Sequence, residues 1–87
     1  MKLFFIIVRD SDGETVSQAL VDRGYRVTRV ASTGGFLKRG NVTLMSGVED
    51  ERVHDVLGLL REICAPAEPG QKRATIFVVD MPLFEQI

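Results

Sequence analysis

Two strand-like segments of this chain are apolar on both of their faces. Residues 3–8 read Leu-Phe-Phe-Ile-Ile-Val and residues 76–79 read Ile-Phe-Val-Val. A strand with one solvated face alternates apolar and polar residues, so these segments need cover on both faces of their sheet. Another copy of the chain is the simplest cover in so short a protein. We therefore expect self-association; the alternative is a monomer with an unusually apolar surface.

The length of the chain also favours self-association. Its 87 residues predict a single domain over 1–87, and a domain of this size buries only about 60–65% of its unfolded surface. Cys64 is the only cysteine and His54 the only histidine, so a disulfide and a structural zinc site are both excluded. The longest apolar run, 3–8, is too short for a membrane span or a signal peptide. We expect a cytoplasmic oligomer with no membrane insertion.

The predicted elements follow the order βαββαβ. Strands are predicted over 2–8, 25–32 (with a bulge at 29–31), 41–47 and 74–81, helices over 12–23 and from residue 49 onward, and loops over 33–40 and 65–73. Two split βαβ halves of this kind predict an α+β, ferredoxin-like sandwich. Its antiparallel sheet would carry both helices on one face.

Local signals place the two helices. Ser11 and Glu14 have the spacing of a capping box, and Gly24 supplies a stop for the first helix. Glu49 and Asp50 place acids in the first turn of the second. Apolar residues at helical spacing predict the buried face of that helix: Val53, Val56, Leu57, Leu60, Ile63 and Cys64.

Catalytic residues are not evident. Cys64 and His54 lie ten residues apart on one predicted helix, a rise of about 15 Å, so they cannot pair within a chain. We interpret Cys64 as a small buried hydrophobe and His54 as a surface residue. The acids fall mainly on helix faces and in caps. The sequence therefore predicts a protein that is not an enzyme, without a metal or a cofactor.

The basic residues are concentrated in one segment. Five lie between Arg23 and Val48, where there is no acid, whereas the rest of the chain has six basic and twelve acidic residues. The glycines, hydroxyls and Phe36 of this segment suit a nucleotide, because backbone N–H groups and arginine bind phosphate and an aromatic ring stacks on a base. A solvated basic face and a plain glycine turn are the alternatives. Asn41 and Val42 stand where a P-loop requires Lys and Ser/Thr, and the 41–47 strand lacks the aromatic platform of RNA-binding relatives of this fold.

The same segment resembles a known family. Residues 25–37 read Tyr-Arg-Val-Thr-Arg-Val-Ala-Ser-Thr-Gly-Gly-Phe-Leu, residues 40–44 Gly-Asn-Val-Thr-Leu, and residues 47–50 Gly-Val-Glu-Asp. They resemble the bacterial PII-like cyclic di-AMP receptors, and the likeness covers 1–64 and resumes at 74–78. It implies a homotrimer that holds one cyclic di-AMP in each of three clefts between subunits.

The resemblance also implies the residues of the site. Arg26 and Thr28 would face the phosphates, Gly35, Phe36 and Leu37 would frame and stack an adenine, and Asn41 and Gly47 would hold a base edge or the loop shape. Each has a structural alternative. Arg26 and Thr28 would otherwise be solvent-facing strand residues, Phe36 a plug in the trimer interface, and Asn41 and Gly47 turn residues.

One feature departs from the family. Its receptors usually carry a long loop between the second helix and the last strand, which helps to cover the ligand, whereas 65–73 is only nine residues here. Loops of this kind carry function. The leading hypothesis is a receptor that orders its 33–40 loop on binding cyclic di-AMP, or a related adenine nucleotide, and so signals to a protein partner. The alternatives are a trimeric interaction scaffold that binds no nucleotide and, less favoured, an enzyme acting on one.

Overall fold

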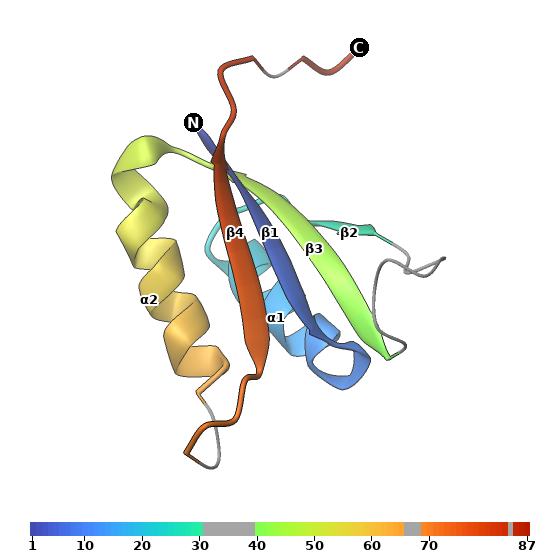
Figure 1. Ribbon diagram of the computed structural model, residues 1–87. Helices are drawn as coiled ribbons and strands as arrows, with labels where there is room; N and C mark the ends of the chain where they lie inside the picture. Colours follow the sequence, from blue (N-terminus) through green and yellow to red (C-terminus); the bar gives the residue numbers. More distant parts are fainter. Residues whose placement is uncertain (31–39, 66–68, 84) are drawn as a thin grey trace.

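The computed structural model describes residues 1–30, 40–65, 69–83 and 85–87 (Figure 1). Its elements are β1 (Lys2–Arg9), α1 (Asp10–Asp22), β2 (Thr28–Val30), β3 (Asn41–Val48), a 3-10 turn η1 (Asp50–Arg52), α2 (Val53–Ile63) and β4 (Ala74–Asp80). All four predicted strands and both predicted helices are therefore confirmed, although several of their bounds differ.

The sheet has the arrangement that the βαββαβ order predicts. Its strand order is β2-β3-β1-β4, and each neighbouring pair is antiparallel. Both helices lie on the same face of this sheet (Figure 1). The architecture is thus α+β and compatible with a ferredoxin-like fold. Within the described part of the chain, no helix is long and apolar enough to cross a membrane.

The core lies between the sheet and the two helices. Its buried side chains are Phe4, Ile6, Val8, Val16, Leu20, Val42, Leu44, Val48, Val56, Leu59 and Leu60. Leu59 was not among the residues predicted for the buried face of α2. All six residues that were predicted for this face are buried or packed against the core.

The opposite face of the sheet is apolar as well. Thr28, Met45, Phe5 and Phe77 are register partners in one row across the four strands. Phe77 is 54% exposed and Val79, on the same face of β4, is 43% exposed. The prediction of strands with two apolar faces is therefore confirmed, and the face away from the helices is open to solvent at Phe77 and Val79.

The start of α1 corrects the capping-box prediction. The helix begins at Asp10, its N-cap residue is Arg9, and no side chain caps it. Ser11 is therefore already inside the helix. Because β1 runs directly into α1, a long-range bond replaces the local motif: the Asp10 N–H donates to the carbonyl of Gly40 at 2.8 Å. The predicted stop is confirmed, since Gly24 adopts a φ of 88° just after the helix.

The second strand is shorter than predicted. Residues 25–27 lie outside β2, and Tyr25 and Val27 pack against the core instead. Arg29 and Val30 pair in regular register with β3, so the predicted bulge is absent at these two residues. Ala31 and residues 33–39 of the predicted loop lie outside the described residues.

Gly13 is a point of close packing between α1 and the sheet. A Cβ at this buried position would lie 2.9 Å from Cγ1 of Val42 in β3, and the branched Val42 side chain has little freedom to move. We expect Gly13→Ala to lower the free energy of unfolding by about 1–3 kcal/mol. Urea denaturation followed by circular dichroism measures this change.

Gly58 offers the matched control. It is exposed on α2, and a Cβ added at this position would meet nothing within 4 Å. Gly58→Ala should raise the free energy of unfolding by about 0.5–1 kcal/mol, because alanine has the higher helix propensity. Equal effects of the two substitutions would contradict the close packing assigned to Gly13.

Candidate functional site

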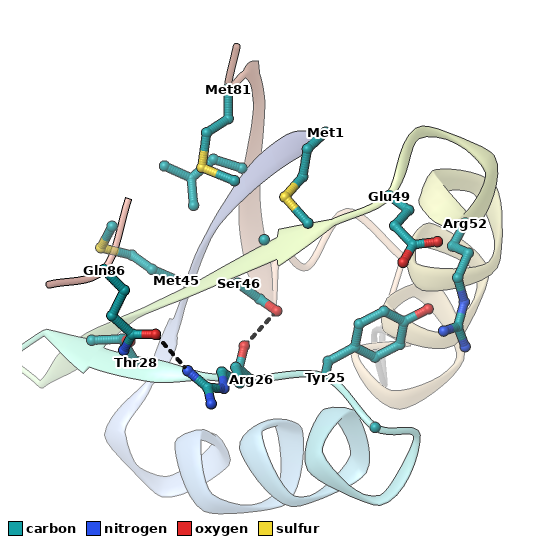
Figure 2. Close-up of a pocket in the computed structure, with 13 residues that line it drawn as sticks. Met1, Tyr25, Arg26, Thr28, Met45, Ser46, Glu49, Arg52, Met81 and Gln86 are labelled. Carbon is teal, nitrogen blue, oxygen red and sulfur yellow. Dashed lines mark hydrogen bonds between the residues drawn. The ribbon is translucent and has the colours of Figure 1, made fainter. Parts of the chain in front are cut away.

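A pocket of about 430 Å³ lies at one end of the sheet (Figure 2). It is formed where β1 begins, where β3 and β4 end, and where the chain enters β2. Its lining residues are Met1, Leu3, Gly24, Tyr25, Arg26, Thr28, Met45, Ser46, Gly47, Glu49, Arg52, Met81 and Gln86. Leu3, Met45 and Gly47 belong to the apolar face away from the helices, so the pocket borders that face.

Arg26 is the central cation of the pocket. The Ser46 hydroxyl donates to the Arg26 carbonyl at 2.7 Å, which fixes the backbone where ladder pairing with β3 has not yet begun. The guanidinium Nη1 donates to Oε1 of Gln86 at 3.0 Å. Among the described residues, none of the ion pairs involves Arg26. Its positive charge is therefore not neutralised by a bound carboxylate.

A second arginine lies at the same pocket. The Arg52 guanidinium is 4.7 Å from the centroid of the Tyr25 ring, a cation–π contact. Glu49 is the one acid among the lining residues. Two arginines against one glutamate leave the lining positive, which favours an anionic ligand.

The charges beside the pocket cancel each other. Lys2 and Asp80 form a hydrogen-bonded ion pair next to Met1 and Met81. The hydrogen bond to Asp80 raises the pKa of Lys2, and the same bond lowers the pKa of Asp80. Both groups stay ionised near neutral pH, so the pair adds no net charge to the positive lining.

Gly47 keeps one wall of the pocket closely packed. A Cβ at this position would lie 3.1 Å from Cε of Met81 and 3.7 Å from Sδ of Met1. The absence of a side chain therefore lets these two methionines lie against β3. The result is an apolar wall beside the arginines, a combination that suits a ligand with an anionic and an aromatic part.

The structure brings together three of the seven residues predicted for the site. Arg26, Thr28 and Gly47 all line the pocket. Asn41 does not, because it pairs with Arg9 at the other end of β3, about 20 Å along the strand from Gly47. Gly35, Phe36 and Leu37 lie outside the described residues.

Tyr25, Arg52 and Gln86 were not predicted as site residues. Gln86 belongs to the segment after β4, where no periodicity gives a signal, and Tyr25 was assigned to a strand. Arg73, in the 65–73 segment, does not reach the pocket. Its guanidinium donates to the Ala65 carbonyl at 3.0 Å and contacts Asp12 at 3.3 Å, at the opposite end of the sheet.

The chain is similar to a known family and to a solved structure. A family model described as cyclic-di-AMP receptor matches residues 1–70. A crystal structure of a functionally unknown protein from Pediococcus pentosaceus ATCC 25745 is similar over 99% of this chain and 96% of that one, with 34% sequence identity and a TM-score of 0.79. The family match contains Arg26, Thr28 and Gly47, whereas Met81 and Gln86 lie beyond it.

Proposed function

The chain belongs to the cyclic-di-AMP receptor family, and from this premise we propose that it is a signal receptor, not an enzyme, that binds cyclic di-AMP in the pocket at Arg26. The main support for the proposal is that Arg26, Thr28 and Gly47 line the same pocket, which is positively charged and partly apolar. Cyclic di-AMP offers two phosphates for the arginine and two adenines for the apolar wall. The volume of about 430 Å³ lies within the range of small-molecule sites.

The apolar outer face supports a homotrimer of the PII-like kind. Phe5, Phe77 and Val79 lie on this face, and the pocket borders it through Leu3 and Met45. A neighbouring subunit that covers the face would therefore meet the rim of the pocket. In such a trimer the ligand would lie at the boundary between subunits, and each copy would supply part of the site.

The position of Asn41 gives this arrangement a specific consequence. Asn41 and Gly47 lie at opposite ends of β3, so the two cannot hold one base within a single chain. We infer that Asn41, with the adjacent 33–40 loop, reaches the ligand from the neighbouring subunit. Ordering of that loop on binding would then change the surface offered to a protein partner.

Mixed trimers test the sharing of the site. Arg26→Ala and Asn41→Ala should each bind much more weakly when purified alone, with few sites occupied at a ligand concentration that saturates the unmodified protein. Trimers assembled at random from both variants should regain about a quarter of the sites, because that fraction of clefts receives an intact Arg26 from one subunit and an intact Asn41 from the next. Equilibrium dialysis with labelled cyclic di-AMP measures the recovered sites. No recovery, or full binding by Asn41→Ala alone, would contradict the assignment.

Gly47→Ala tests the apolar wall. The added methyl would lie 3.1 Å from Cε of Met81 and push this flexible side chain into the pocket. We expect about a tenfold weaker affinity for cyclic di-AMP, a loss of roughly 1.4 kcal/mol, with an unchanged melting temperature. Fluorescence titration and thermal unfolding give the two values. Unaltered affinity would remove Gly47 from the binding wall.

A panel of nucleotides tests the ligand class. Thermal unfolding with cyclic di-AMP, cyclic di-GMP, ATP and AMP should show the largest rise in melting temperature with cyclic di-AMP, because a ligand stabilises the state that binds it. A larger rise with ATP would keep the site but change the signal. No rise with any nucleotide would favour the alternative function, a trimeric scaffold for protein partners, which the short 65–73 segment suggests.

A further inference from the structure

All three methionines of the chain line the same pocket. Met1, Met45 and Met81 come from three separate places in the sequence, and the protein has no others. Figure 2 draws all three around this one opening. The Met81 N–H donates to the Met1 carbonyl at 3.0 Å, and the ends of both side chains lie close to Gly47. The apolar wall of the pocket is thus built largely from thioethers.

These thioethers are within reach of small oxidants. Met1 is 50% exposed, and Met45 and Met81 are partly exposed. Cys64, the other oxidisable sulfur, lies outside the pocket and is partly buried. Burial raises the pKa of its thiol, which lowers the fraction of reactive thiolate. The oxidisable sulfur atoms at the pocket are therefore those of the three methionines.

We propose that Met1, Met45 and Met81 form a reversible oxidation site through which peroxide weakens ligand binding; this inference rests on the proposed function of the pocket. In each step the thioether sulfur attacks one oxygen of hydrogen peroxide. An S–O bond forms, the O–O bond breaks, and water leaves. The sulfur is oxidised by two electrons and the peroxide is reduced. Methionine sulfoxide reductases, with a thiol as reductant, reverse the change.

The packing around Gly47 explains why oxidation would matter. Met81 already lies so close to β3 that a Cβ on Gly47 would be 3.1 Å from its Cε. Oxidation adds an oxygen to Sδ of side chains that lie against this strand at the edge of the pocket. There it places a polar S=O group where the ligand requires an apolar surface, and an unpaired polar group at a buried contact opposes binding.

Replacement of methionine by norleucine provides a control that keeps the shape of the side chain. Norleucine has a CH₂ group in place of the sulfur and cannot form a sulfoxide. Both proteins carry Cys64→Ser, so that thiol oxidation does not contribute. Each is treated with hydrogen peroxide, sulfoxide at each methionine is quantified by peptide mass spectrometry, and cyclic di-AMP is titrated before and after treatment.

We expect oxidation of the methionine protein to weaken binding by at least about tenfold, with an unchanged circular dichroism spectrum. Treatment with the two methionine sulfoxide reductases, one for each sulfoxide epimer, should restore the affinity. The affinity of the norleucine protein, whatever its value before treatment, should not change after peroxide. Unaltered affinity of the fully oxidised protein, or an equal loss in the norleucine protein, would overturn this inference alone. Failure of the untreated protein to bind cyclic di-AMP would instead contradict the proposed function, and this inference with it.

Discussion

Arg26→Ala should lower the affinity for cyclic di-AMP by about 10- to 100-fold, the usual effect of removing a charge-assisted hydrogen bond. The Arg26 guanidinium lines the pocket, and its one hydrogen-bonded side-chain partner among the described residues is the neutral Gln86. Its positive charge is therefore available to bind a phosphate group. Arg26→Lys should recover only part of the affinity, because lysine keeps the charge but not the two-pronged geometry. Isothermal titration at two salt concentrations measures both the loss and its electrostatic component.

Arg61→Ala is the matched control for this experiment. Arg61 is exposed on α2 and does not line the pocket, so the substitution removes the same charge from the protein without touching the site. We expect its affinity to stay within about twofold of the unmodified protein at physiological salt, where the Debye length is about 8 Å. An equal loss in both variants would mean that net charge, and not Arg26, governs binding.

Phe77→Asp should convert the proposed trimer into monomers. Phe77 is 54% exposed on the outer face of β4, next to Phe5 of β1. In the proposed trimer a neighbour buries this ring, so a carboxylate there would be desolvated without a partner, which is strongly unfavourable. Because the side chain points away from the core, the fold itself should remain. Sedimentation velocity gives the mass, and circular dichroism reports the fold.

Val21→Asp controls for the loss of an exposed apolar side chain. Val21 is 49% exposed but lies on α1, on the helix side of the molecule. This variant should remain a trimer. A trimeric Phe77→Asp protein would show that the outer face of β4 is not an interface, and dissociation of both variants would indicate a general loss of stability.

The fold was predictable where the pattern was local and repeated. The buried face of α2 was predictable because apolar residues such as Val56 and Leu60 recur at helical spacing. The segments around Phe5 and Phe77 were predictable as strands with two apolar faces because their apolar runs are continuous. The start of α1 was not predictable in this way, because the bond from Asp10 to Gly40 joins distant parts of the chain. The capping box predicted at Ser11 does not form, and this tertiary contact satisfies the first N–H of the helix instead.

The candidate site was predictable only in part. Arg26, Thr28 and Gly47 lie in motifs that the resemblance covers, and the structure places them together. Arg52 and Gln86 reach the pocket because the ends of several strands meet there. A short sequence motif does not predict such a tertiary arrangement. Asn41 shows the converse. It belongs to the same motif region, yet the length of β3 separates it from the pocket.

The proposed function is that of a trimeric receptor with one cyclic di-AMP site for each subunit. Isothermal titration of the purified protein with cyclic di-AMP, on a sample whose mass is determined by sedimentation, tests it most directly. We predict a trimer that binds one cyclic di-AMP per subunit at micromolar concentration or tighter. A trimer that gives no binding heat, at two temperatures chosen to exclude an accidental zero in the enthalpy, would contradict the account.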